Sequence, residues 1–226
     1  MPDLPYIPTS AVEVVNFAMT RIGAHPVQSL DTPGPAGIAP AKTYSAVVLN
    51  VMSKYPWHFT KATVALERRT EAPVRGWQYR YKLPTDRIAL PRAYYDSKGS
   101  AFAEHEGRPL TRFQLEGSEV LTDASEVWVT YQRVAPTPHW PGYFVELIIL
   151  ALAAELALVI REDRILRKEL RIDAFGLPAQ GGEGGLMGEA MSLDAQAVPA
   201  PRIDGGRNPV HDAGYLPGDI RNDWNY

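Results

Sequence analysis

The feature that most limits the fold of this chain is an apolar run of 17 residues, from 144 to 160. It is shorter than the roughly 20 apolar residues that a membrane span usually needs, and it contains Glu146 and Glu155. Each charge near the centre of a bilayer costs roughly 2.5–3.5 kcal/mol on insertion scales. We therefore predict a buried helix of a water-soluble protein.

The two glutamates also indicate that this helix is covered on most sides. They are nine positions apart, which places them on opposite sides of a helix that turns about 100° per residue. A helix without one clean polar face is normally surrounded by protein. The neighbours are either other subunits or the other helices of a monomeric bundle. For the first case, the side chains expected at the subunit contact are Leu147, Leu150, Ala154 and Leu158.

Three further helices are predicted from apolar spacing and from capping residues. They cover residues 11–22, 44–55 and 165–175, and residues 161–164 are either a polar elbow before the last of these or a continuation of the central helix. Ser10 and Glu13 form a candidate capping box for the first, and Gly23 supplies its stop. Pro56 ends the second helix, and the Phe-Gly-Leu-Pro sequence from Phe175 ends the third. Helical segments thus lie on both sides of the middle of the chain.

In that middle region the apolar period changes from 3.6 to 2. The alternation is clearest over 77–83 and 127–132, which we predict to be half-buried strands. Shorter strands are expected at 58–67, 88–90, 102–105 and 119–122. The predicted fold class is α+β, mainly α: a bundle of about four helices with an inserted antiparallel β-rich subdomain and an extended C-terminal arm.

The last 46 residues, 181–226, have a composition that does not favour a core of their own. They carry seven acidic and three basic side chains, a net charge of −4 within a chain whose total is −3. Gly181 to Gly185 is interpreted as a flexible linker, and the segment buries too little apolar surface to offset its ordering entropy. Large side chains near its end are expected to anchor it on a partner: Tyr215, Leu216, Ile220, Trp224 and Tyr226.

The predicted organisation therefore has four parts. They are the N-terminal helices (1–56), the β-rich subdomain (57–136), the C-terminal helices (137–178) and the Gly/Pro-rich acidic arm (179–226). Without the last 46 residues the net charge is +1, which does not demand a nucleic-acid ligand. The N-terminus lacks the basic and apolar regions of a signal peptide, so folding in the cytoplasm is expected.

Motifs that carry chemistry are absent from the sequence. There is no cysteine, and no Walker loop, GxGxxG, GxSxG or HExxH pattern. The five histidines are dispersed, and Glu104, His105 and Glu106 would alternate between the two faces of a strand. We therefore predict a protein that is not an enzyme and has no cofactor and no metal site.

Several short motifs follow one another along residues 10–175. They are Ile22-Gly23 with Pro26-Val27 and Ser29-Leu30, Trp57-His58-Phe59, Trp77-Gln78-Tyr79-Arg80-Tyr81-Lys82-Leu83-Pro84-Thr85-Asp86, Val129-Thr130-Tyr131, and Phe144 leading into Leu152 to Ala157. In this order they resemble the head-to-tail adaptor family of tailed phages, in particular the tail tubular protein A type of short-tailed phages.

The resemblance implies a structural virion protein in the neck, at the head-tail junction, assembled in the host cytoplasm. In that family twelve copies form a ring under the portal protein and carry the tail nozzle. Double-stranded DNA passes through the channel without sequence-specific binding, and no membrane is involved. The resemblance also implies that the C-terminal arm docks on the portal, and a free monomer that forms its ring only there is compatible with it.

Two other function classes remain. One is another connector component, such as a stopper or tail-completion protein, which would share the architecture and bind different neighbours. The other is a virion-associated cell-wall hydrolase, which needs paired carboxylates in one cleft. Glu146 and Glu155 are candidates for such a pair, although their expected positions on opposite faces argue against a shared site.

Overall fold

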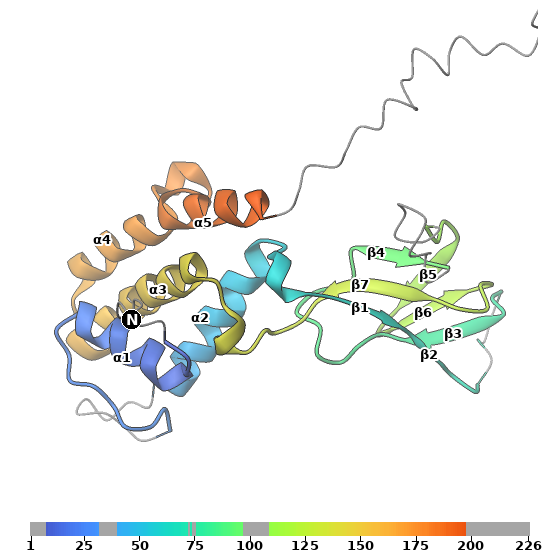
Figure 1. Ribbon diagram of the computed structural model, residues 1–226, viewed down its shortest axis with the longest axis horizontal. Coiled ribbons are helices and arrows are strands. Elements are labelled where there is room, and N and C mark those ends of the chain that lie inside the picture. Colours follow the sequence, from blue (N-terminus) through green and yellow to red (C-terminus); the bar gives the residue numbers. More distant parts are fainter. Residues whose placement is uncertain (1–7, 32–39, 72, 74–75, 97–108, 198–226) are drawn as a thin grey trace, which may run out of the picture.

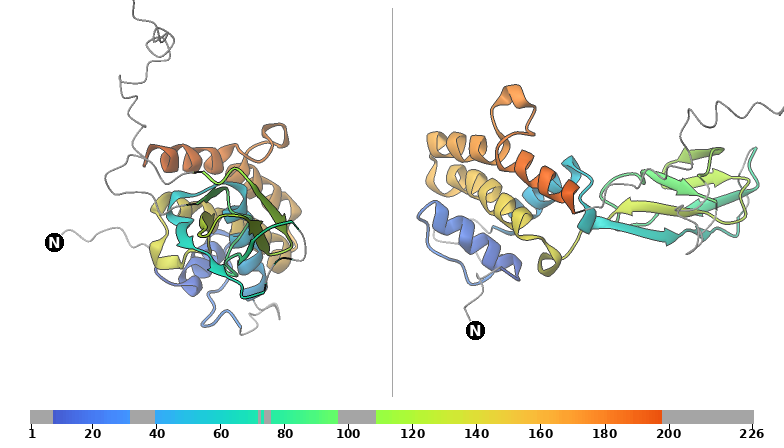
Figure 2. Two further views of the ribbon diagram at one scale, coloured as in Figure 1. Left: turned by 90° about the vertical axis from the view of Figure 1, so that its right-hand side faces the viewer. Right: turned by 45° about the horizontal axis from the view of Figure 1, so that its top comes forward.

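The protein has two lobes arranged end to end (Figure 1). Our computed structural model describes residues 8–31, 40–71, 73, 76–96 and 109–197. Helices form one lobe and strands form the other, and the chain crosses between them twice (Figures 1 and 2). Because both termini of the β lobe return to the bundle, the strands are an insertion in a helical domain. The predicted α+β class with antiparallel sheets is confirmed.

The helical lobe is built around one central helix. The described residues contain five α-helices: α1 (Ala11–Arg21), α2 (Ala41–Lys54), α3 (Gly142–Arg161), α4 (Arg164–Phe175) and α5 (Gly185–Gln196). Short 3-10 helices occur at His58–Thr60 (η1), Thr137–His139 (η2) and Pro178–Gln180 (η3). Helix α3 contacts all four of the other α-helices. The apolar run is therefore a buried helix, as predicted.

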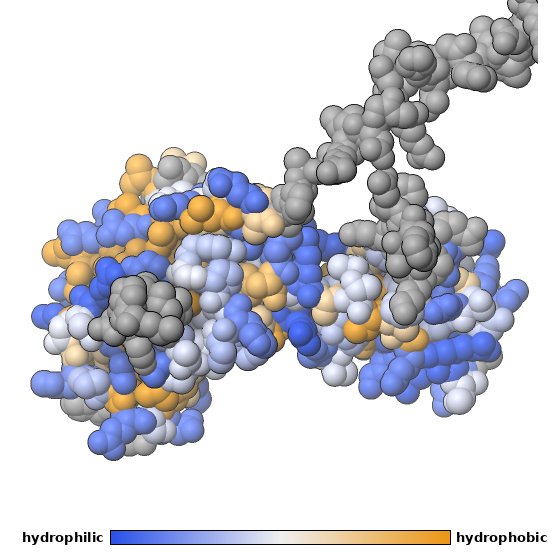
Figure 3. Space-filling view, in the orientation of Figure 1, coloured by the Kyte–Doolittle hydropathy of each residue, from blue (hydrophilic) through white to orange (hydrophobic). Residues whose placement is uncertain are grey.

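The β lobe consists of two antiparallel sheets with a shared core. Their orders are β1-β7-β4 and β2-β3-β6-β5. The strands are β1 (Lys61–Ala65), β2 (Glu67–Arg68), β3 (Tyr79–Lys82), β4 (Ala93–Tyr95), β5 (Phe113–Glu116), β6 (Glu119–Thr122) and β7 (Trp128–Gln132). Tyr81, Val120 and Val129 are fully or almost fully buried between the sheets. On the face shown in Figure 3, this lobe is mostly hydrophilic, whereas apolar surface is more extensive over the helices.

Local sequence signals set the start of the bundle. The Ser10 hydroxyl accepts a hydrogen bond from the Glu13 amide at 3.3 Å, and the Glu13 carboxylate accepts one from the Ser10 amide at 3.2 Å. These two bonds make the predicted capping box, which satisfies amides that the first turn of a helix leaves free. Helix α1 then buries Val14, Val15 and Ala18 against α3.

Several strand predictions differ from the structure. Residues 58–67 begin with η1 before β1, and 88–90 contain no strand. The strand predicted at 102–105 lies outside the described residues. Strands β4 and β5 were not predicted, because three or four residues at a sheet edge give too short a period to recognise. A turn with Gly117 at a φ of 59° joins β5 to β6, so the Glu-Gly dipeptide was the available signal.

The predicted extended arm begins too early. Residues 185–196 form α5, whose Met187, Ala190 and Asp194 are buried. The preceding glycines are a defined turn instead of a flexible linker, with positive φ at Gly181, Gly182 and Gly185. A Cβ on Gly185 would lie 2.4 Å from the Asp173 carbonyl oxygen. The turn therefore needs glycine both for its backbone conformation and for its space.

We predict that Gly185→Ala destabilises the protein far more than Gly117→Ala. Both glycines have positive φ, which costs a side-chain-bearing residue about 1–2 kcal/mol. Only Gly185 lies against other backbone atoms, whereas a Cβ on Gly117 would meet open space. Overpacking adds roughly 1–3 kcal/mol for Gly185→Ala. Urea unfolding of the two variants measures the difference, and equal losses would contradict the packing of this turn.

Candidate functional site at the junction of the lobes

The first crossing between the lobes is held by a buried tryptophan. Trp57 is 0% exposed, and its indole N–H donates to the Val51 carbonyl oxygen at 3.1 Å. Aromatic rings surround it, with centroid distances of 4.9 Å to Tyr55, 5.0 Å to Phe144 and 6.1 Å to Phe59. The crossing is therefore part of the core of the helical lobe, and the β lobe leaves it from a fixed point.

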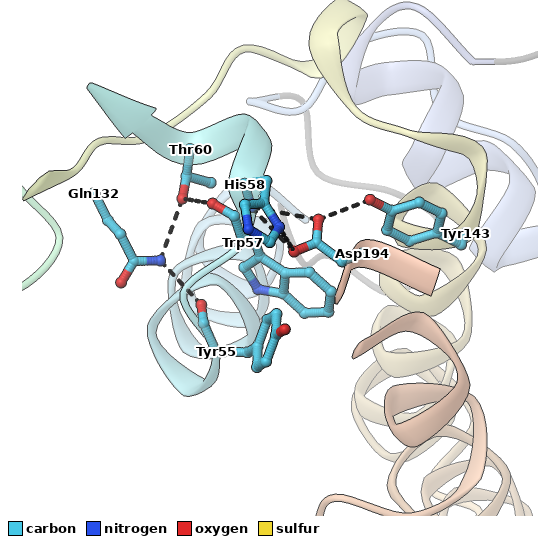
Figure 4. A network of polar contacts seen from close by, with 7 residues as sticks. All are labelled: Tyr55, Trp57, His58, Thr60, Gln132, Tyr143 and Asp194. Carbon is cyan, nitrogen blue, oxygen red and sulfur yellow. Dashed lines mark hydrogen bonds and ion pairs between the residues drawn. The ribbon is translucent and has the colours of Figure 1, made fainter. Parts of the chain in front are cut away.

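A buried carboxylate from α5 closes over this crossing. Asp194 is 0% exposed, and three groups donate hydrogen bonds to it (Figure 4). They are the Tyr143 hydroxyl at 2.8 Å, the His58 backbone N–H at 3.1 Å and the His58 Nδ1 at 2.8 Å. A carboxylate that is buried away from water is stable only when such hydrogen-bond donors take the place of the water molecules that would solvate it. The cluster thus joins three elements, namely α5, η1 and the first turn of α3.

A second layer of hydrogen bonds extends from η1 to the β lobe. The Gln132 side-chain amide, on β7, donates to the Tyr55 carbonyl oxygen at 2.9 Å and to the Thr60 hydroxyl at 3.2 Å. The Thr60 hydroxyl in turn donates to the Trp57 carbonyl oxygen at 2.7 Å. Asp194 and Gln132 therefore hold the same crossing from opposite sides, as Figure 4 shows.

The surroundings of Tyr143 favour its neutral form. Burial raises the pKa of the Tyr143 phenol, and the hydrogen bond to Asp194 and the negative charge of that carboxylate raise it further. The pKa of Tyr55 is raised as well, by burial first and then by Asp194. A neutral Tyr143 can keep donating to Asp194 over the whole physiological pH range.

The polar groups of this cluster form hydrogen bonds with one another, which suits the cluster to holding elements together. Both oxygens of Asp194 accept bonds from His58, and one of them also accepts from Tyr143. In the part of the chain that the structure describes, no group of three or more His, Cys, Asp or Glu side chains could hold a metal ion. We interpret the cluster as a latch, defined as Asp194, His58 and Tyr143, that fixes α5 at the lobe junction.

The predicted subunit-contact residues lie mainly in the core of this chain. Leu147 is 0% exposed, Ala154 1% and Leu150 9%, while Leu158 is half-buried. The neighbours of α3 are therefore the other helices of the same bundle, which was the second alternative. The correction has a simple cause: apolar periodicity shows that a helix is covered, but it does not show whose helices cover it.

The predicted portal anchors Tyr215, Leu216, Ile220, Trp224 and Tyr226 lie outside the described residues. The latch residues Asp194 and Tyr143 were not predicted. The signal for Asp194 was present, because Leu186, Met187, Ala190, Met191 and Asp194 share one helical face. It was hidden by the high glycine and proline content of the surrounding 46 residues.

The two glutamates of α3 do lie on different faces. The Glu146 carboxylate pairs with Arg21 of α1, whereas Glu155 pairs with Arg167 and Arg171 of α4 at 3.0 Å and 3.2 Å. The two carboxylates therefore do not meet in one cleft.

Comparisons with known proteins give no family for this chain. No protein-family model matches it, and no curated protein is similar enough to count as a match. Among the described residues, α3 is the one helix long and apolar enough to cross a membrane, by length and composition only. A buried core helix passes the same test, and α3 is enclosed by four other helices.

We predict that Asp194→Asn loosens α5. The NH₂ group of the new asparagine would face the donors of His58 and Tyr143 and find no acceptor there. A buried unsatisfied donor costs about 1–3 kcal/mol. Glu189→Gln is the matched control, because it makes the same chemical change at an exposed position of the same helix. In the free protein, hydrogen exchange of the α5 amides should accelerate in the first variant and stay unchanged in the second. Equal exchange rates in the two variants would refute the latch.

We also predict a loss of stability at alkaline pH that depends partly on Tyr143. Its pKa in the folded state is raised, whereas that of an unfolded tyrosine is about 10. The folded state therefore holds this proton more tightly, so its contribution is fully present below pH 10 and declines above it, by at most about 1.4 kcal/mol per pH unit. The free energy of unfolding, measured by urea titration between pH 8 and 11, should fall less steeply in Tyr143→Phe. Parallel curves for the two proteins would contradict this.

Proposed function

We propose that this protein is a head-to-tail adaptor in the neck of a tailed-phage virion. In this role several copies form a ring under the portal protein, dock on it through their C-terminal segments, and provide the platform for the tail and the DNA channel. The proposal starts from the aromatic and turn motifs that follow one another over residues 10–175, and it is supported by the fixed position of α5, which precedes the C-terminal segment.

The observation that carries most weight is that α5 is a fixed base for the C-terminal segment. Asp194 is latched at the lobe junction, only three residues before the described chain ends at Ala197. The 29 residues that follow, 198–226, can span up to about 95 Å when extended. A segment that starts at a defined point and ends in Trp and Tyr anchors suits docking on a large partner better than simple solubilisation.

The two-lobe architecture also suits a connector. A bundle whose central helix is covered by its own chain keeps its shape before and after assembly, and its outer helix faces are free to meet neighbours. The β lobe projects from one end of it (Figure 2). Since a fold alone does not give a function, this observation supports the proposal without carrying it.

The alternatives differ in how well the described residues support them. A stopper or tail-completion protein would have the same architecture, and only the identity of the partner separates it from an adaptor. The hydrolase alternative needs two carboxylates about 5–9 Å apart across a substrate. Its candidate pair, Glu146 and Glu155, bind arginines of different helices, so these two carboxylates do not form such a site.

The test is binding to the portal protein encoded by the same genome. A chain ending at Ala197 keeps α5 and its latch but lacks the anchors, so we predict that it folds normally and loses portal binding. Trp224→Ala in the full chain should weaken binding by at least about 30-fold, as expected for an interface hot spot. Asn222→Ala is its neighbouring control. Unchanged binding of the shortened chain, measured by interferometry and electron microscopy, would refute docking through this segment.

A further inference from the structure

The helical lobe has a groove whose lining contains no residue of α5. It lies between α2 and α4, has a volume of about 460 Å³, and is floored mainly by Val47, Val51, Ala151 and Val159. At one end the Lys54 ammonium lies 4.2 Å from the centre of the Phe175 ring. An elongated apolar floor between two helices is the shape that accepts a third helix.

The rim of this groove is mainly positive. Lys42, Lys54 and Arg171 line it together with one carboxylate, Glu155. That carboxylate already pairs with Arg167 and Arg171, so the two lysines dominate the electrostatic potential. The pKa of Lys54 is lowered mainly by burial, and the positive charge of Arg171 lowers it further. An acidic helix with an apolar ridge would fit this groove.

Helix α5 presents such a ridge. Its inner face is buried through Met187, Ala190 and Asp194, whereas Glu189 is exposed and Leu193 is 41% exposed. Glu189 and Leu193 are one helical turn apart and so lie on the same face. Apolar and hydrophilic residues lie side by side over α4 and α5 at the upper edge of the lobe (Figure 3). The outer surface of α5 thus combines a carboxylate with a large apolar side chain.

The α5 of a given chain cannot enter the groove of that same chain. The latch holds it against another part of α3, where Glu146, Leu150 and the exposed Glu189 line an open hollow between α3, α4 and α5. Positions 150 and 151 are about 100° apart on a helix, and positions 146 and 155 about 180° apart. The groove and the α5 ridge therefore face different directions, and a second copy is needed to bring them together.

We propose that the α5 ridge of one copy, Glu189 with Leu193, docks in the α2–α4 groove of the next copy. Leu193 lies on the apolar floor, and Glu189 faces the lysines of the rim. Because two different surfaces meet, the contact is heterologous and repeats from copy to copy until a ring closes. This inference rests on the proposed ring and identifies the side chains that would hold it.

Cysteine cross-linking tests the contact directly, because the chain has no cysteine of its own. Leu193→Cys is combined with Ala46→Cys, which is exposed and lines the groove. The control combines Leu193→Cys with Ser45→Cys, an exposed neighbour that does not line it. With the full chain assembled on the portal, oxidation should give a ladder of linked copies for the first pair and at least tenfold less for the second. Equal yields, or no ladder, would overturn the proposal.

Charge reversal gives an independent readout. Glu189→Lys should weaken self-association by at least about tenfold, as should Lys42→Glu, and the two together should recover it. Both side chains are exposed, so folding is expected to be unaffected, and circular dichroism checks this. Rings that form on the portal without the cross-link and without charge dependence would refute this contact and leave the adaptor role standing. A chain that neither binds the portal nor self-associates would refute both.

Discussion

One buried carboxylate, Asp194, ties together the elements that meet at the junction of the two lobes. Asp194 has no exposed surface, and an unpaired charge in that position would cost several kcal/mol. The Tyr143 hydroxyl, the His58 backbone N–H and the His58 Nδ1 donate hydrogen bonds to it. These donors come from the start of α3 and from the chain crossing into the β lobe, so the carboxylate is satisfied only when the helices, the crossing and α5 are all in place. If one of these elements were displaced, buried polar groups of the others would lose their hydrogen-bond partners, which is costly. The junction is therefore cooperative.

The rest of the helical lobe provides the frame for that carboxylate. Helix α3 is apolar on nearly all sides, and other helices of the same chain cover most of it. This differs from a subunit whose central helix is covered only when neighbouring subunits bind to it. The contact that we propose between copies therefore uses the outer faces of α2, α4 and α5, where charged rims flank apolar side chains. Such mixed surfaces are stable in water and still able to associate.

Much of this fold could be predicted from signals in neighbouring residues, whereas contacts between distant residues could not be predicted. The capping box at Ser10 and the apolar run of α3 both depend on residues that are close together in the sequence, and both were predicted. The short edge strands β4 and β5 have too few residues for a period, and α5 was obscured by the glycines around it. The pairing of His58 with Asp194 could not be predicted, because the two residues are 136 positions apart. Their pairing depends on how the bundle closes.

The central claim is that α5 is a fixed base from which the C-terminal segment docks. Hydrogen exchange of the full chain, alone and on the portal, tests it most directly. The account predicts that α5 amides exchange slowly in both states, and that residues 215–226 gain protection only when the portal is present. If α5 exchanged rapidly in the free protein, or if residues 215–226 were unchanged on the portal, the account would be contradicted.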